Sequence, residues 1–205
     1  MTFAEEYLRQ LIETVSQLDL TRVDQAIEWL KQAREHGRHI FVCGNGGSAS
    51  TASHFACDIG KGASRARQSR FRIVALTDNL PTLTAYANDV GYDSVFIEQL
   101  KSFALPGDVL MAISGSGNSQ NVVQAVEYAN ACGLKTIGLT GRDGGKLGAV
   151  VQLNIHVPVP HMGRIEDTHM VVCHMIAYYF METEGATTLC EREHSCPIVI
   201  GRVAT

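Results

Sequence analysis

The chain has 205 residues, which is enough for one domain with a well-buried core. Its net charge of −4 is spread without a basic stripe, so the composition argues against nucleic-acid binding. No segment is apolar over the length of a membrane-spanning helix, and the N-terminal residues do not resemble a signal peptide. We therefore expect a cytoplasmic protein that does not bind a membrane.

The N-terminal region is predicted to be helical. Apolar residues recur at spacings of three and four from Phe3 to Val15, and again from Val23 to Ala33. A break at residues 19–21 separates the two patterns, and Gly37 ends the second. Residues 1–36 are thus expected to form a pair of helices.

After this pair, short apolar runs alternate with helical patterns. The runs are residues 39–43, 72–76, 109–113, 136–139 and 153–157, and the helical patterns cover residues 48–60, 80–103, 119–132 and 164–182. Such alternation is typical of βαβ units, so the sequence predicts an α/β fold with a five-stranded parallel sheet flanked by helices. We expect one domain, with an α/β core at 37–183 and a tail at 184–205.

Ligands of such folds bind beyond the carboxyl ends of the strands, which directs attention to the loops at 44–48, 77–79, 114–119 and 140–145. In the first loop, Gly44-Asn-Gly-Gly-Ser, the glycines permit close approach of another molecule to the backbone. Ser48 stands where a helix N-cap is expected. Free amides and a helix dipole would then favour an anion in this turn.

A second polar cradle is expected at Ser114-Gly-Ser-Gly-Asn-Ser119. Three hydroxyls and two glycines precede a helix, and hydroxyls with backbone amides suit a phosphate without any Lys or Arg. The alternative interpretation is a flexible Gly/Ser turn. The spacing in the two loops matches neither a Walker loop nor a dinucleotide fingerprint.

Two helices carry side chains that could transfer protons or hold a metal. His54 and Asp58 share one helix face, whereas Glu166 and His174 lie loosely on one side of another helix. Together they suit zinc or a similar divalent ion, or general acid–base chemistry. The alternatives are an ordinary surface pair at His54 and Asp58, and a core histidine at His174 bonded to a backbone carbonyl. His169 is the less favoured histidine of the second helix.

The cysteine content predicts free thiols in a reducing compartment, since most of the six lie in apolar contexts. They are Cys43, Cys57, Cys132, Cys173, Cys190 and Cys196. Cys190 and Cys196 flank His194, but this spacing matches no common zinc signature.

These motifs resemble those of the phosphoheptose isomerases, which have the sugar-isomerase (SIS) fold. The resemblance covers about residues 1–183 and rests on GNGGS, HFxxD at 54–58, Ala87-Asn88-Asp89, SGSGNS and RIEDTHMVVCH. It implies a three-layer sandwich and isomerisation of sedoheptulose 7-phosphate to D-glycero-D-manno-heptose 7-phosphate. It also implies a homotetramer with active sites at subunit interfaces and one Zn²⁺ per subunit.

The resemblance further implies roles for individual residues. The sugar-phosphate site would be lined by Asn45, Gly46, Gly47, Ser48 and Glu166. Sugar hydroxyls would bind Asn88 and Asp89 from a neighbouring subunit. The phosphate would bind Ser114, Gly115, Ser116 and Ser119. Zinc would bind His54, Asp58, Glu166 and His174, with Asp58 as catalytic base and His174 as acid.

Two residues depart from the family pattern. Asp58 replaces the usual Glu and is one methylene shorter, and Glu166 replaces the usual Gln and adds a negative charge that should tighten a divalent cation. These departures leave open that the chain binds another sugar phosphate, either as the substrate of an isomerase or as the ligand of a sensor. A non-catalytic adaptor on the same fold, binding the bacterial replication initiator, is also open. Such an adaptor has no reason to keep His54, Asp58 and His174 together.

Overall fold

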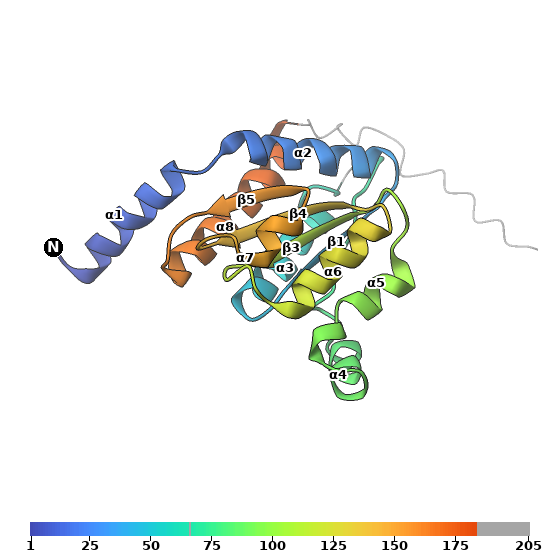
Figure 1. The fold of residues 1–205 in the computed structure, drawn as a ribbon. Helices are drawn as coiled ribbons and strands as arrows, with labels where there is room; N and C mark the ends of the chain where they lie inside the picture. The colour runs from blue at the N-terminus through green and yellow to red at the C-terminus, as the bar shows by residue number, and fades with distance from the viewer. Residues whose placement is uncertain (66, 184–205) are drawn as a thin grey trace, which may run out of the picture.

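The computed structural model describes residues 1–65 and 67–183, so the Cys190, His194 and Cys196 motif lies outside the described residues. Its centre is a five-stranded parallel sheet in the order β2-β1-β3-β4-β5 (Figure 1). The strands are β1 (His39–Gly44), β2 (Arg72–Ala75), β3 (Val109–Ser114), β4 (Lys135–Gly141) and β5 (Leu153–Val157). The expected parallel sheet is therefore confirmed, with strand ends that lie within two residues of those predicted.

Eight α-helices precede, connect and follow the strands within the described residues. They are α1 (Phe3–Ser16), α2 (Leu20–Glu35), α3 (Gly47–Cys57), α4 (Leu80–Asp89), α5 (Ile97–Phe103), α6 (Gln120–Ala131), α7 (Gly145–Val150) and α8 (Met162–Tyr178). Shorter elements are the π-helical turns η1 (Asp58–Gly62) and η3 (Tyr179–Thr183) and the 3-10 turn η2 (Tyr92–Ser94).

The predicted element bounds need three corrections. The single helix expected over 80–103 is divided into α4, η2 and α5, because Gly91 leaves the helical region with φ at 121°. The break expected at 19–21 is narrower, since Asp19 caps α2 by accepting a hydrogen bond from the Thr21 amide at 3.0 Å. The loop expected over 140–145 runs straight into the short helix α7.

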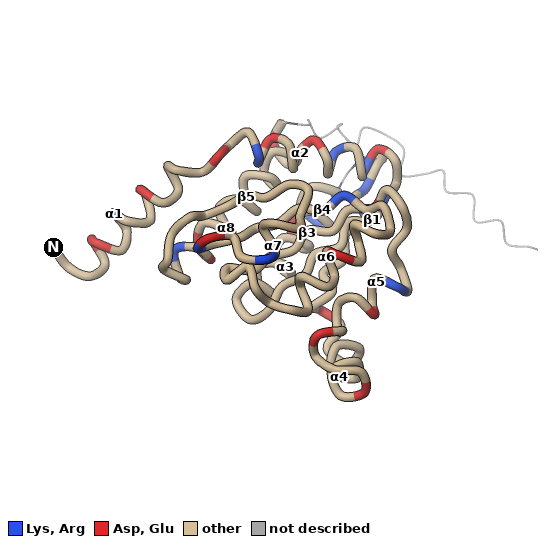
Figure 2. Tube along the Cα trace, viewed as in Figure 1, with Lys and Arg blue, Asp and Glu red and all other residues tan. Residues whose placement is uncertain are grey.

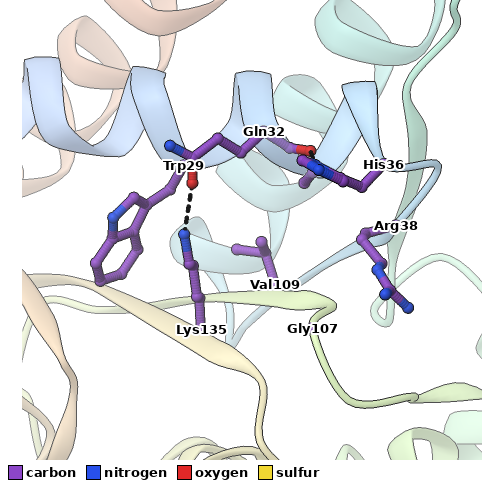
Figure 3. A pocket seen from close by; sticks show the side chains of 8 residues that line it. Trp29, Gln32, His36, Arg38, Gly107, Val109 and Lys135 are labelled. Atoms are coloured by element: carbon purple, nitrogen blue, oxygen red, sulfur yellow. Dashed lines mark hydrogen bonds between the residues drawn. The ribbon is translucent and has the colours of Figure 1, made fainter.

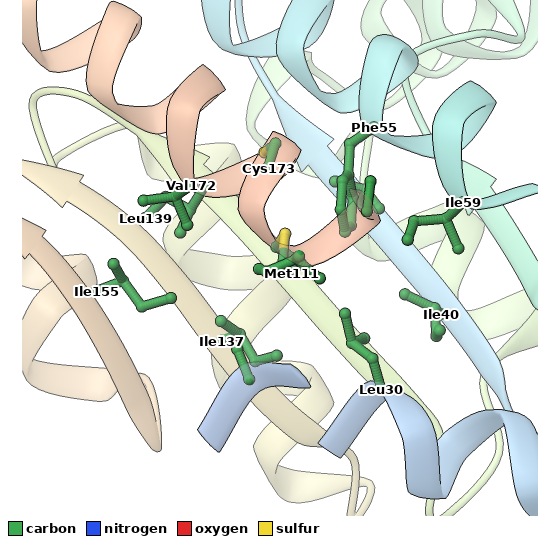
Figure 4. Packing of buried hydrophobic residues seen from close by; sticks show 14 of the residues in the cluster. Leu30, Ile40, Phe55, Ile59, Met111, Ile137, Leu139, Ile155, Val172 and Cys173 are labelled. Carbon is green, nitrogen blue, oxygen red and sulfur yellow. The ribbon is translucent and has the colours of Figure 1, made fainter. Parts of the chain in front are cut away.

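Each face of the sheet packs against its own set of helices, which makes the fold a three-layer sandwich. Alternate residues of β1 illustrate this: Ile40 and Val42 pack with α2, α3 and α8, whereas Phe41 and Cys43 pack with α5, α6 and α7. Figure 4 shows the first of these cores, to which α3 contributes Phe55, α8 contributes Val172 and β3 contributes Met111. Helices α3 and α8 are thereby held side by side on one face of the sheet.

Helix α1 extends away from the sandwich and leaves its apolar face uncovered (Figure 1). Phe3 is 82% exposed, Leu8 58% and Ile12 61%. The helix is tied to α8 by polar contacts, including a hydrogen bond of 2.6 Å from the Tyr7 hydroxyl to Asp167.

Among the residues that the structure describes, no helix is long and apolar enough to cross a bilayer.

Candidate active site

His54, Asp58 and His174 form one compact cluster on the outer side of α3, η1 and α8. The Nε2 atoms of His54 and His174 lie 3.1 Å apart. One carboxylate oxygen of Asp58, Oδ2, is 3.2 Å from His54 Nε2 and 3.8 Å from His174 Nε2. The structure thus unites three of the four side chains expected to form a metal or acid–base set.

Packing beneath the cluster positions these side chains. Phe55 and Ile59 are neighbours of His54 and Asp58 in sequence, and both are fully buried against α8. Cys173 directly precedes His174 and is 1% exposed (Figure 4). At Asp58 the α-helix widens into the π-helical turn η1, a distortion that is frequent at functional sites. The cluster therefore stands on rigid, buried anchors.

The two histidines of α8 have opposite environments. The His174 side chain is 44% exposed, so the interpretation of this residue as a core histidine is wrong. His169 is the core histidine: it is 1% exposed, and its Nε2 lies 3.1 Å from the Thr140 carbonyl oxygen. Burial lowers the pKa of His169 to about 4. His174 is therefore the histidine of α8 that a ligand can reach.

The cluster fits a divalent metal ion. Ligand atoms of a tetrahedral zinc ion lie about 2.0–2.1 Å from the metal and therefore about 3.3 Å from one another. The separations of 3.1, 3.2 and 3.8 Å among the three side chains bracket this value. Two imidazoles and one carboxylate are a donor set that zinc accepts in catalytic sites, which keep a further position for water or substrate.

Glu166 lies outside this cluster. A Cβ atom on Gly47 would come within 2.6 Å of Glu166 Oε1, so the carboxylate rests directly over the start of α3. That helix begins at Gly47 with Gly46 as its N-cap, which corrects the expected cap at Ser48. Ser48 is instead a buried residue of the first turn, 6% exposed. A metal-binding role for Glu166 stays a prediction, whereas its position beside the first glycine loop is a finding.

The second expected cradle is built around the hydroxyl of Ser114 at the end of β3. Its Oγ lies 3.3 Å from the Oγ atoms of both Ser116 and Ser119, so three hydroxyls converge where α6 begins. Gly117 has φ at 64°, and a Cβ there would collide with the carbonyl of Gly144. The turn is therefore a defined structure braced by the next loop and not a flexible linker.

A hydrogen-bond network that sequence reasoning missed holds Asn45 in the first loop. Its side chain exchanges two hydrogen bonds with Asn121, at 2.9 and 3.0 Å, and its Oδ1 also accepts the Tyr92 hydroxyl at 2.8 Å. Asn121 is 2% exposed on an otherwise apolar face of α6. The signal for this network in the sequence was Asn121 itself, a polar residue among apolar residues that become buried. The network joins the first glycine-containing loop to η2 and to α6, the helix that follows the second such loop.

Asn88 and Asp89 lie apart from this site within the chain. Both are exposed at the end of α4, which projects from the sandwich (Figure 1), and Asn88 Nδ2 donates to Asp89 Oδ1 at 2.7 Å.

Among the loops at the carboxyl ends of the strands, residues 77–79 contribute Asp78, whose carboxylate accepts a hydrogen bond from Ser53 of α3.

Comparison with known proteins first defines the class. The family model of the SIS domain matches residues 4–141, which is more than half of the chain. The fold is thus that of a SIS-domain protein, as the motifs indicated.

The comparisons then identify the particular family. The chain is 41% identical over 172 residues to the phosphoheptose isomerase of Aliarcobacter butzleri, covering 84% of this chain and 88% of that relative. The solved phosphoheptose isomerase of Neisseria gonorrhoeae superposes with a TM-score of 0.80 at 34% identity, covering 86% of this chain and 96% of that one. The corresponding structure from Francisella tularensis gives a TM-score of 0.80 at 29% identity, covering 87% and 94%. The chain belongs to the phosphoheptose isomerase family.

Proposed function

We propose that the protein isomerises sedoheptulose 7-phosphate to D-glycero-D-manno-heptose 7-phosphate. The observation that carries the proposal is the cluster of His54, Asp58 and His174 in a chain that matches phosphoheptose isomerases over most of its length. The three converging hydroxyls at Ser114, Ser116 and Ser119 supply the phosphate site.

The reaction requires a proton to move between adjacent carbons. Asp58 removes a proton from C1 of the ketose, which gives an enediol, and returns a proton to C2. His174 carries a proton from the C1 hydroxyl to the oxygen at C2, so the product differs from the substrate only in the positions of two hydrogens. Because the two side chains lie 3.8 Å apart at their closest polar atoms, both reach one pair of neighbouring carbons.

The same residues would hold a zinc ion. His54, Asp58 and His174 offer the ligands, and Glu166 is the candidate for a fourth. A bound zinc ion would polarise the substrate carbonyl and so favour loss of the neighbouring proton. The phosphate contacts of the Ser114–Ser119 loop provide the binding energy that orients the sugar.

The proposal extends to assembly and location. The uncovered apolar face of α1, with Phe3, Leu8 and Ile12, suits packing against other subunits, in a homotetramer with sites at the interfaces. In that assembly Asn88 and Asp89, remote from the cluster of their own chain, would contact the sugar in a neighbouring subunit. The cytoplasmic location expected from the sequence stays a prediction.

The adaptor and sensor alternatives are not favoured. A binding protein needs the phosphate loop alone, whereas this chain also brings two imidazoles and a carboxylate within 4.8 Å of one another. The comparisons with curated phosphoheptose isomerases point to the same choice.

Turnover of sedoheptulose 7-phosphate by the purified protein tests the proposal. The protein is stripped of metal with a chelator, assayed, and assayed again after zinc is restored. We expect turnover that depends on zinc. A folded protein that shows no turnover in either condition would overturn the proposal in favour of another sugar phosphate or a binding role.

A further inference from the structure

A pocket lies at the amino ends of the strands, at the opposite end of the sheet from the Ser114–Ser119 loop. It has a volume of about 210 Å³ and is formed where the end of α2 meets the starts of β1, β3 and β4. Side chains that define it are Trp29, Gln32, His36, Arg38, Val109 and Lys135 (Figure 3). Because β1 and β3 each have six residues, about 20 Å of strand separates this pocket from the phosphate loop.

Two cations face the pocket. Lys135 donates a hydrogen bond of 2.8 Å to Gln32 Oε1, and its ammonium lies 5.1 Å from the centre of the Trp29 ring. Arg38 is exposed, and its guanidinium makes no hydrogen bond or ion pair with residues 1–65 or 67–183. In Figure 3, Trp29 and Lys135 lie on one side of Val109 and Arg38 lies on the other. The pocket thus places around one opening an ammonium and a guanidinium that has no ion pair within the described residues.

In the part of the chain that the structure describes, carboxylates lie beside the pocket in sequence but not in its lining. Among the described residues that line the pocket none is a carboxylate. Three carboxylates adjoin lining residues in the sequence: Glu28 accepts a hydrogen bond from Gln32 Nε2 at 2.8 Å, the buried Asp108 accepts the His39 amide at 2.9 Å, and Glu35 is exposed. Figure 2 shows Lys and Arg segments beside Asp and Glu segments where α2, β1 and β4 meet. Within the described residues, the groups that line the opening thus include two cations and no carboxylate.

We propose that this pocket binds a phosphate-bearing small molecule at a site separate from the isomerase centre. The guanidinium fork of Arg38 and the ammonium of Lys135 would share the phosphate oxygens, because a guanidinium matches phosphate in two hydrogen bonds while an ammonium acts as a point charge. The half-buried ring of Trp29 offers an apolar wall to the rest of the ligand. Gly107 leaves room for the guanidinium, since a Cβ there would lie 3.2 Å from Arg38 Nε.

The pocket carries its own reporter, because Trp29 is the one tryptophan of the whole chain. Tryptophan fluorescence of the full-length protein is recorded during titration with inorganic pyrophosphate, up to about 10 mM and at constant ionic strength set with sodium chloride. We expect a saturable change with pyrophosphate and none with sodium chloride alone.

Matched variants separate this pocket from general charge effects and from the phosphate loop. Arg38→Gln should weaken pyrophosphate binding at least about tenfold. Arg22→Gln, which removes the same charge from an exposed position on α2, should change the affinity less than about twofold. Ser116→Ala should leave the Trp29 titration unchanged. The proposal is overturned if no saturable change occurs, if Arg38→Gln binds as tightly as the unmodified protein, or if Ser116→Ala abolishes the change.

Discussion

His54 and His174 bring their Nε2 atoms to 3.1 Å from each other, although 120 positions separate them in the chain. Two imidazolium ions at this distance would repel each other. Two neutral imidazoles that face each other through Nε2 need either one proton or one cation between these two nitrogen atoms. With Asp58 Oδ2 3.2 Å from His54, the arrangement favours a divalent ion between the three groups.

Loss of one imidazole should therefore weaken metal binding strongly. His54→Ala is expected to lower zinc affinity at least about a hundredfold, because one of three ligands is removed while changes in supporting residues alone cost 10–100-fold. Isothermal titration of the metal-stripped protein with zinc measures this. His36→Ala, a histidine exposed at the end of α2, is the control. Equal zinc affinity in His54→Ala and the unmodified protein would contradict the metal assignment.

The converging hydroxyls at the end of β3 should act mainly on substrate binding. Ser116→Ala removes one hydrogen bond to a charged phosphate, so KM should rise about tenfold or more while the proton-transfer residues are untouched. Steady-state kinetics with sedoheptulose 7-phosphate measure the effect, and Ser102→Ala in α5 is the matched control. An unchanged KM would show that the phosphate binds elsewhere.

The phosphate loop should be intolerant of a side chain at Gly117. Gly117 and Gly37 have nearly the same backbone angle, with φ at 64° and 63°, but a Cβ on Gly37 meets nothing within 4 Å whereas a Cβ on Gly117 strikes Gly144. Gly37→Ala should cost about 1 kcal/mol of unfolding free energy from backbone strain alone. Gly117→Ala should cost clearly more, as urea denaturation would measure. Equal losses in both variants would mean that the contact with Gly144 is unimportant.

Buried His169 should make the protein less stable in mild acid. Its folded pKa is lowered to about 4 by burial, whereas an unfolded histidine titrates near 6.5. Between these values the unfolded chain binds a proton that the folded chain does not, so stability is full above pH ~6.5 and falls by about 3 kcal/mol as the pH drops to ~4.

A variant without this titration isolates the effect. His169→Asn keeps a donor for the Thr140 carbonyl and should show a smaller loss of unfolding free energy between pH ~6.5 and ~4.5. His36→Asn should keep the full loss. Denaturation curves at several pH values measure both, and identical pH dependence in His169→Asn and the unmodified protein would assign the acid sensitivity to other groups.

Local pattern was sufficient to predict the strands and most helices. Apolar runs such as 39–43 and 109–113 are buried on both faces of the sheet, and this explains why their signal was strong. The division of residues 80–103 was not foreseen, because α4 has no buried residue and its pattern continues past Gly91. The cap at Gly46 was missed because Ser48 is a better capping residue by type, although the chain places it inside the first turn.

Site residues that share one helix could be predicted from their spacing. Site residues that are brought together by tertiary packing were harder to predict. The spacing of His54 and Asp58 fixes a common face, but the choice between His169 and His174 depends on which side of α8 meets the sheet. The contacts of Asn45 with Asn121 and Tyr92 join segments far apart in sequence, and no local pattern encodes them. The separation of Glu166 from the cluster likewise follows from the packing of α8 against α3.

The most direct test of the isomerase account follows proton transfer at Asp58. Sedoheptulose 7-phosphate is converted in D2O by the zinc-loaded protein, and the product is examined for deuterium at C2. The unmodified protein and Asp24→Asn, a control on the exposed face of α2, should turn over and incorporate solvent deuterium at C2. Asp58→Asn should lose about a hundred- to ten-thousand-fold in kcat. Near-normal turnover by Asp58→Asn would contradict the assignment of this cluster as the catalytic centre.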